Sequence, residues 1–143
     1  MYFVARLMGK IVAFLSPLLR RGGGTSAPGM VLLRLHPKAL SKLSGSLVRG
    51  SVLISATNGK TTTTRFLSEI LNDAGVASVS NTSGANLKSG VATALLTKER
   101  HHDMGVLEVD EAALPEVVKE SRPRMLILMN LFRDQLDLSL IHI

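Results

Sequence analysis

A short polar stretch, Ala56–Thr62, follows a run of apolar residues and carries the residue types of a phosphate-binding loop. Asn58 and Gly59 allow a tight turn whose backbone N–H groups face inward, and Lys60 can place a positive charge near the β- and γ-phosphates of a nucleotide. The hydroxyl group of Thr61 can bind a magnesium ion. These residue types predict a site for a nucleoside triphosphate and magnesium, formed by Thr57, Asn58, Gly59, Lys60, Thr61 and Thr62.

The motif is only partly of the common type, in which another glycine precedes Gly59 by five residues, because Ile54 stands at that position here. A Gly-Lys-Thr tripeptide also fits the N-terminus of an ordinary helix whose first turn is capped by threonine. The residues on either side favour the phosphate loop. A strand is predicted before it, and a helix after it is indicated by apolar residues at Phe66, Leu67, Ile70, Leu71 and Ala74.

The elements that must position this loop follow from the alternation of apolar patterns after residue 50. Strands are predicted at 52–55, 76–80, 104–109 and 125–129, and helices at 61–74, 87–98 and 114–121. Such alternation predicts an α/β fold, with a P-loop-type parallel sheet, right-handed crossovers and flanking helices.

Ligands of such sheets bind beyond the carboxyl ends of the strands, so the residues that follow each strand are candidates. Glu108 ends a predicted strand and is the best candidate to hold magnesium together with Thr61. Asp110 and Glu111 fit better as acidic residues at a helix N-terminus. The amide of Asn130 either contacts a phosphate or a ligand of the metal, or belongs to an ordinary turn.

Composition limits the classes of partner. The chain has 143 residues, of which 45% are hydrophobic and 3% aromatic, so a globular core is expected and a surface that stacks nucleic-acid bases is not. The absence of cysteine excludes disulfides and thiolate metal sites within these residues. The net charge is +6, and no Asp or Glu occurs before Glu69. Such a basic leader indicates either an anionic partner or surface, or solvated helix faces.

Residues 1–45 are predicted to form a basic amphipathic helical leader. The first helix carries an apolar stripe, Phe3, Leu7, Ile11, Phe14 and Leu18, and is weakened or ended by Pro17. The nine uncharged residues between Lys10 and Arg20 are far fewer than the roughly 20 needed to cross a bilayer. We expect the stripe to pack against the rest of the protein, with membrane contact as the alternative. A flexible connection from Arg21 to Gly29 and short helices broken at Pro37 are expected to follow.

The stretch at 56–62 is similar to the phosphate loop of the Mur ligases and folylpolyglutamate synthases. Three further stretches, Asn81–Leu87, Leu107–Glu111 and Asn130–Asp137, make the chain resemble the MurT family within that group. Gln135 supports this resemblance, because other Mur ligases usually have histidine there. The resemblance covers about residues 1–137, including the short leader, which takes the place of the uridine-nucleotide-binding domain of ordinary Mur ligases.

The resemblance implies an ATP-dependent ligase subunit in peptidoglycan synthesis, paired with the glutaminase GatD. Such a subunit amidates the stem-peptide D-glutamate of lipid II to D-isoglutamine, in the cytoplasm and at the inner face of the membrane. It also implies that Lys60 and Thr61 bind phosphate and magnesium, that Glu108 binds magnesium, and that Asn86 and Asn130 contribute to the nucleotide site. Another Mur ligase, a folylpolyglutamate synthase-like enzyme, or a nucleotide-binding module without catalysis are the alternatives.

Two departures from the family lead to further expectations. Residues 46–137 correspond to the N-terminal part of the family's central ATP-binding domain, and the zinc ribbon and C-terminal domain of the family are not found in these 143 residues. We therefore expect this stretch alone to be inactive, with an unpaired sheet edge and exposed core surface. Residues 138–143 differ from the family pattern and are expected to be a non-native tail.

Overall fold

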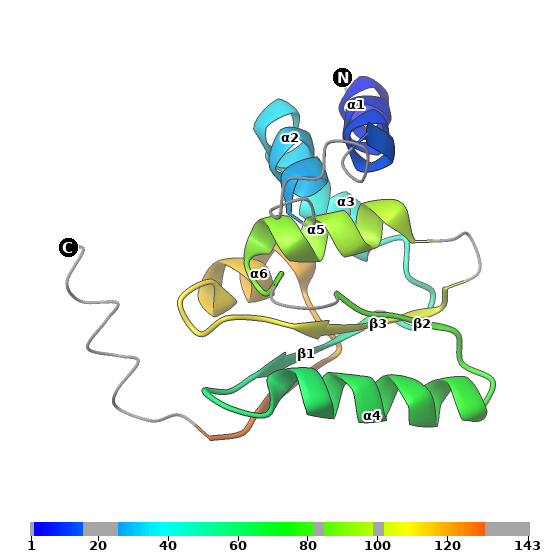
Figure 1. The fold of residues 1–143 in the computed structure, drawn as a ribbon, viewed down its shortest axis with the longest axis vertical. Coiled ribbons are helices and arrows are strands. Elements are labelled where there is room, and N and C mark those ends of the chain that lie inside the picture. Colours follow the sequence, from blue (N-terminus) through cyan, green and yellow to red (C-terminus); the bar gives the residue numbers. More distant parts are fainter. Residues whose placement is uncertain (1, 16–25, 82–84, 99–101, 131–143) are drawn as a thin grey trace.

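The computed structural model describes residues 2–15, 26–81, 85–98 and 102–130 (Figure 1). Four parallel strands form one sheet in the order β2-β3-β1-β4, which confirms the predicted P-loop-type α/β fold. The strands are β1 (Ser51–Ser55), β2 (Ser78–Val79), β3 (Met104–Glu108) and β4 (Met125–Leu128). The helices are α1 (Tyr2–Leu15), α2 (Ala27–Leu35), α3 (Ala39–Ser44), α4 (Lys60–Asp73), α5 (Lys88–Thr97) and α6 (Leu114–Ser121).

The central strand β1 is buried along its whole length. Val52 lies beside Val106 of β3 and Met125 of β4, so β1 has a neighbour on each side. Strands that are covered on both faces of a parallel sheet read as continuous apolar runs, which is why the sequence located β1 and β3 within one residue at each end. The prediction for β2 was too long, since only Ser78 and Val79 pair with β3 at this edge of the sheet.

Helices cover the two faces of the sheet unequally. In Figure 1, α4 lies along one face, whereas α5 and α6 lie on the other, with the leader helices beyond α5. The larger core is on the α5 side and joins leader residues such as Leu32 and Leu40 to Leu53, Leu95 and Leu107. Helices of the leader and the sheet therefore share one core in the described part of the chain. The proposed division at residue 45 stays a prediction.

The apolar face predicted for α4 is only half right. Leu67 and Leu71 pack against the sheet, but Phe66 and Ile70 are exposed, with 63% of Phe66 accessible. The pattern at i, i+1, i+4 and i+5 is broader than the strip of α4 that meets the sheet. β4, at the sheet edge, also exposes Met125, Leu126 and Leu128, as expected of an uncovered edge.

The leader contains three helices, and the predicted break at Pro37 is confirmed between α2 and α3. The expected flexible connection through Gly29 is wrong at its end, because Ala27–Gly29 form the first turn of α2. Pro28 stands at the start of that helix, where its fixed φ is suitable and its missing N–H is not needed. Residues 138–143 lie outside the described residues.

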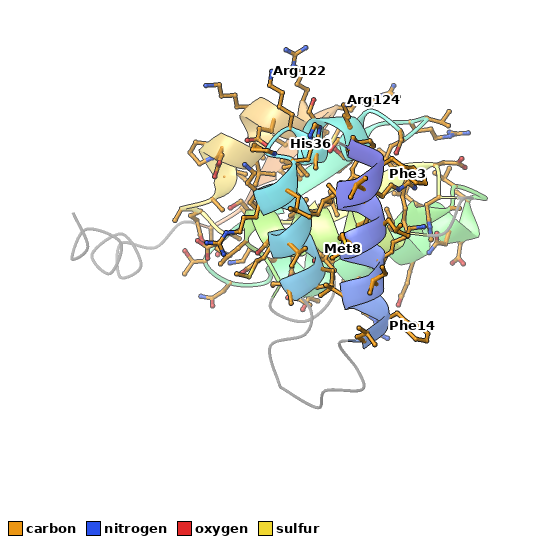
Figure 2. The ribbon with its side chains drawn as sticks, turned by 90° about the horizontal axis from the view of Figure 1, so that it is seen from above. Phe3, Met8, Phe14, His36, Arg122 and Arg124 are labelled. Carbon is orange, nitrogen blue, oxygen red and sulfur yellow. The ribbon has the colours of Figure 1, made fainter. Side chains whose placement is uncertain are left out.

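The packing of α1 contradicts the prediction for its apolar stripe. The buried residues of α1 are Ala5 and Gly9, whereas Phe3 and Phe14 of the stripe are 76% and 81% exposed. Figure 2 looks down on α1 and shows Phe3, Met8 and Phe14 on its outer side. The reason is close approach: a Cβ atom at Gly9 would lie 2.7 Å from Leu96 Cδ2, so only a small residue fits between α1 and α5.

Candidate nucleotide-binding site

The loop between β1 and α4 turns at Gly59, whose φ of 86° is in the left-handed region that favours glycine. α4 begins at the next residue, and the N–H of Thr63 donates to the carbonyl oxygen of Gly59 at 3.0 Å. The backbone N–H groups that precede this bond lie at the positive end of the α4 dipole. The predicted strand, loop and helix are thus present, with the geometry that suits an anion.

Asn130, two residues after the end of β4, holds this loop from the side. Its carbonyl oxygen accepts the N–H of Thr57 at 2.7 Å, and its Oδ1 accepts the N–H of Asn58 at 2.9 Å. These bonds arise because β4 pairs with β1 in parallel, so the chain leaves β4 beside the loop that follows β1. Asn130 therefore positions the loop.

The two predicted magnesium ligands lie next to each other. Thr61 Oγ1 donates to Glu108 Oε2 at 2.7 Å, although the residues are 47 positions apart in the sequence. Glu108 is the last residue of β3 and is only 1% exposed. A carboxylate and a hydroxyl are hard oxygen donors, and Mg²⁺ in nucleotide sites commonly takes one or two carboxylates plus phosphate oxygens. The pair fits that ion, although the described residues contain no cluster of three metal-binding His, Cys, Asp or Glu side chains.

Asn81, just after β2, fixes the strand end that carries Glu108. Its Oδ1 accepts the N–H of Glu108, and its Nδ2 donates to the carbonyl oxygens of Glu108 and Ala85, each at 2.8 Å. The side chain is buried and joins the end of β3 to the segment that leads into α5. The sequence placed Asn81 in a loop after a strand but did not reveal this function.

Lys60 lies over its own loop. Its Nζ donates to the carbonyl oxygens of Ala56 and Thr57 and lies 3.9 Å from Glu111 Oε1. Glu111 thus faces the loop, and the expectation of a helix N-terminus is wrong, because α6 begins only at Leu114. Asp110 instead stabilises a turn, in which its Oδ1 accepts the N–H of Ala112 at 3.0 Å.

The remaining candidates are peripheral in this arrangement. Thr62 is exposed on the first turn of α4, and Asn86 contributes its carbonyl oxygen to the N–H of Asp110 at 2.9 Å. Gln135 and the other polar residues of 131–137 lie outside the described residues.

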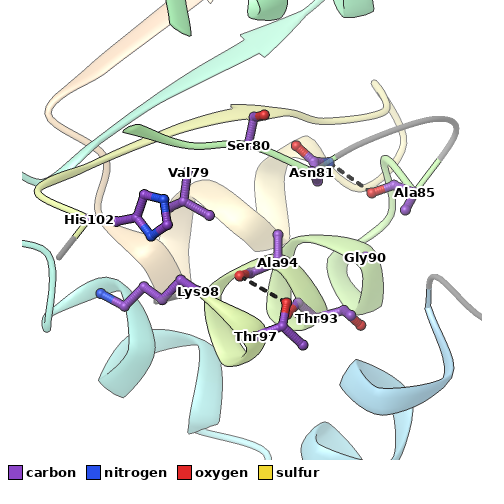
Figure 3. A pocket seen from close by; sticks show the side chains of 10 residues that line it. All are labelled: Val79, Ser80, Asn81, Ala85, Gly90, Thr93, Ala94, Thr97, Lys98 and His102. Carbon is purple, nitrogen blue, oxygen red and sulfur yellow. Dashed lines mark hydrogen bonds between the residues drawn. The ribbon is translucent and has the colours of Figure 1, made fainter. Parts of the chain in front are cut away.

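A separate pocket of about 350 Å³ lies between the end of β2 and α5 (Figure 3). Val79 and Asn81 line it from the strand side, and Thr93 and Thr97 line it from α5. Its lining does not include the phosphate loop. The side chain of Asn81 therefore has two neighbours: its amide bonds the end of β3, and it also lines this pocket.

The site geometry agrees with the comparison to known families. Residues 54–139 match the model of the Mur ligase middle domain. The chain belongs to the Mur ligase family. Its phosphate loop and its buried Glu108 both fall inside the matched region, so the family resemblance drawn from the sequence is confirmed.

Two relatives narrow the resemblance to MurT within the Mur ligase family. The chain is 36% identical over 115 residues to the MurT subunit of lipid II isoglutaminyl synthase (glutamine-hydrolyzing) from Staphylococcus aureus strain N315, and the match covers 80% of this chain. It is also 36% identical over 123 residues to the corresponding subunit from Streptococcus pneumoniae, covering 84% of this chain. The matches cover 26% and 27% of those relatives, so the chain spans about a quarter of their length.

Among solved structures, MurF from Acinetobacter baumannii shares the Mur ligase fold with a TM-score of 0.56 and 21% sequence identity. The alignment covers 71% of this chain and 22% of MurF. At this identity the comparison supports the fold alone.

Proposed function

We propose that this chain is the ATP-binding part of the ligase subunit of a lipid II isoglutaminyl synthase. The observation that carries the proposal is the 36% identity to two MurT subunits over most of the chain. The phosphate loop with its Thr61–Glu108 pair supports an ATP-dependent ligase chemistry. In this proposal residues 46–137 belong to the central ATP-binding domain and residues 1–45 form a leader.

The residues of the loop would bind and orient the triphosphate. Gly59 gives the turn its shape, the first N–H groups of α4 donate to phosphate oxygens, and Asn130 holds the loop from the β4 side. Lys60 would exchange its carbonyl partners, Ala56 and Thr57, for the β- and γ-phosphates. That exchange brings a positive charge to the group that is transferred.

Thr61 and Glu108 would hold Mg²⁺, and the ion would neutralise the negative charge that develops on the transferring phosphoryl group. Glu108 is suited to this function because Asn81 bonds both backbone groups of this residue and so fixes the end of β3. Asn86 and Thr62 are proposed to contribute at the edge of the nucleotide site.

The reaction proposed for the complete protein begins with transfer of the γ-phosphoryl group of ATP to the α-carboxylate of D-glutamate in lipid II. The partner glutaminase, GatD, supplies ammonia, which attacks the acyl phosphate and displaces phosphate to leave D-isoglutamine. The protein would work in the cytoplasm, at the inner face of the membrane where lipid II is exposed. The two relatives, which are subunits of a glutamine-hydrolyzing lipid II isoglutaminyl synthase, support this assignment.

The test is Lys60→Ala in the protein expressed from the complete reading frame together with its glutaminase. We expect glutamine-dependent amidation of lipid II, followed by mass spectrometry, to fall at least 100-fold, the usual scale for removing one electrostatic stabiliser of a transition state. Lys119→Ala, on the exposed face of α6, is the matched control and should retain full activity. Undiminished amidation by Lys60→Ala would reject the phosphate loop. ATP binding without any amidation by the parent protein would instead favour a nucleotide-binding module.

A further inference from the structure

The outer face of α1 is a continuous apolar surface that the described part of the chain leaves uncovered. It consists of Phe3, Val4, Leu7, Met8, Ile11 and Phe14, whose exposed fractions range from 43% to 81%. Phe3, Leu7 and Ile11 are spaced by four residues and therefore lie along one side of the helix. Single exposed apolar residues are common on proteins, but a contiguous patch of this kind marks an interaction surface.

The orientation of this face is fixed by the packing of the opposite face of α1. Ala5 and Gly9 contact the helices beneath, where a Cβ atom at Gly9 would lie 3.3 Å from the carbonyl oxygen of Pro28 and closer still to Leu96. At the N-terminal end, the Tyr2 ring lies 5.2 Å from the His36 ring, and Lys42 Nζ lies 4.7 Å above the Tyr2 ring. The large apolar residues cannot replace Ala5 and Gly9 in this contact, so the helix presents them outward.

The surroundings of the outer face are basic. Arg6 and Lys10 lie on α1 itself, and no Asp or Glu occurs in the first 68 residues of the chain. Burial and the positive charge of nearby Arg6 lower the pKa of Lys98, so α5 also lies within the field of the leader. An apolar face bordered by cations and without carboxylates is the composition of helices that lie in the interface of anionic membranes.

We propose that the outer face of α1 binds the surface of a bilayer that contains anionic phospholipids, with its apolar side chains at the headgroup boundary and with Arg6 and Lys10 beside lipid phosphates. Two copies of α1 packed face to face would bring four cations together without a carboxylate to pair with them, which disfavours self-association. In the described part of the chain, no helix is long and apolar enough to cross a membrane. The proposal is independent of the amidation chemistry, because vesicle binding by α1 requires neither ATP nor the phosphate loop.

The experiment is co-sedimentation of the protein, expressed from the complete reading frame, with vesicles of phosphatidylcholine containing 0 or about 30% phosphatidylglycerol. The double variant Phe3→Ser/Phe14→Ser should lower the partition coefficient for the anionic vesicles at least tenfold, since burial of one such side chain accounts for about that factor. Phe66→Ser is the matched control, because Phe66 is also exposed but lies on α4, across the sheet from α1. It should bind like the parent.

The double variant Arg6→Gln/Lys10→Gln leaves the apolar face intact and tests the charge separately. It should bind anionic vesicles at least fivefold more weakly and with less dependence on salt. Equal sedimentation of the parent and Phe3→Ser/Phe14→Ser overturns the proposal, as does equal binding of the parent to neutral and anionic vesicles. If the parent did not bind vesicles and Phe3→Ser/Phe14→Ser lost a dimer that the parent forms, the proposal would also be overturned, because a second copy would then cover the face. The same holds if this variant had a lower melting temperature and the parent bound no vesicles, because another part of the protein would then cover the face. None of these outcomes changes the prediction for Lys60→Ala.

Discussion

Asn81 offers the sharpest test of how the fold positions the candidate site. Replacing it by alanine removes three hydrogen bonds of 2.8 Å, two of them to the backbone of Glu108 and one to Ala85. All three are buried, and a net contribution of about 1 kcal/mol per bond predicts a loss of about 3 kcal/mol in the free energy of unfolding.

Two assays measure this loss, one for the whole protein and one at the end of β3. Urea denaturation followed by circular dichroism should show the lower free energy of unfolding with little change in slope. Hydrogen exchange monitored by mass spectrometry should show faster exchange in peptides that contain Glu108, because its N–H loses the Asn81 acceptor. The control is Asn72→Ala, which removes two exposed bonds to Ser78 and should cost less than about 1 kcal/mol.

Asn81→Asp distinguishes the effect of losing hydrogen bonds on stability from the effect of losing side-chain volume. Aspartate fills the same space and keeps an acceptor for Glu108, but a carboxylate oxygen then faces two carbonyl oxygens to which the amide had donated. We expect Asn81→Asp to be at least as destabilising as Asn81→Ala at neutral pH. If both variants unfolded like Asn72→Ala and Glu108 kept its protection, the view of Asn81 as the anchor of this strand end would be refuted.

Two further predictions concern the surroundings of α5. Gly29→Ala should lower the free energy of unfolding by about 3 kcal/mol, because the new Cβ atom would meet a backbone oxygen of α5 that cannot move aside. The control is Gly75→Ala, where the Cβ atom has open space but φ is positive, and this change should cost about 1 kcal/mol. Burial lowers the pKa of Lys88, but the hydrogen bonds and negative charges of Glu116 and Glu120 together raise it by more. The net pKa therefore lies above 10.5. The stabilisation by Lys88 is therefore present below that value and lost at higher pH, and the difference in unfolding free energy between the parent and Lys88→Met, about 1 kcal/mol at pH 8, should shrink above pH 10.5. Denaturant titrations at pH 8 and above pH 10.5 would contradict this prediction if the difference between the parent and Lys88→Met stayed constant. The ion pairs concerned join Lys88 to Glu116 and Glu120.

The sequence predicted the part of the fold that depends on local patterns. β1 and β3 are buried on both faces, so their apolar runs were unambiguous, and the carboxyl-end rule correctly brought Glu108 toward the phosphate loop. The function of Asn81 could not be predicted, because it depends on how the segment after β2 returns past the end of β3. No local pattern specifies that path.

The leader shows a second limit of sequence patterns. Amphipathicity identified α1 as a helix with an apolar stripe but did not tell which side contacts the protein. Close packing against α2 and α5 favours small residues on the buried side of α1, because a Cβ atom at Gly9 would already crowd Pro28 and Leu96, and Phe3 or Leu7 would not fit there. In the sequence that side is marked only by small residues spaced by four, Ala5, Gly9 and Ala13, which contribute little to an apolar pattern.

The burial of Glu108 links the stability of the fold to its proposed chemistry. A carboxylate removed from water is destabilising unless charges or hydrogen bonds compensate, and the side chain of Glu108 receives the hydroxyl of Thr61. A core built for stability alone would place an apolar residue at the end of β3, as it does at Leu107. The chain instead places a buried carboxylate there, with its backbone held by Asn81 and its side chain bonded to the hydroxyl of Thr61. That arrangement is understandable if a cation completes the environment of Glu108 during function, since the ion then restores the favourable interactions that burial removed.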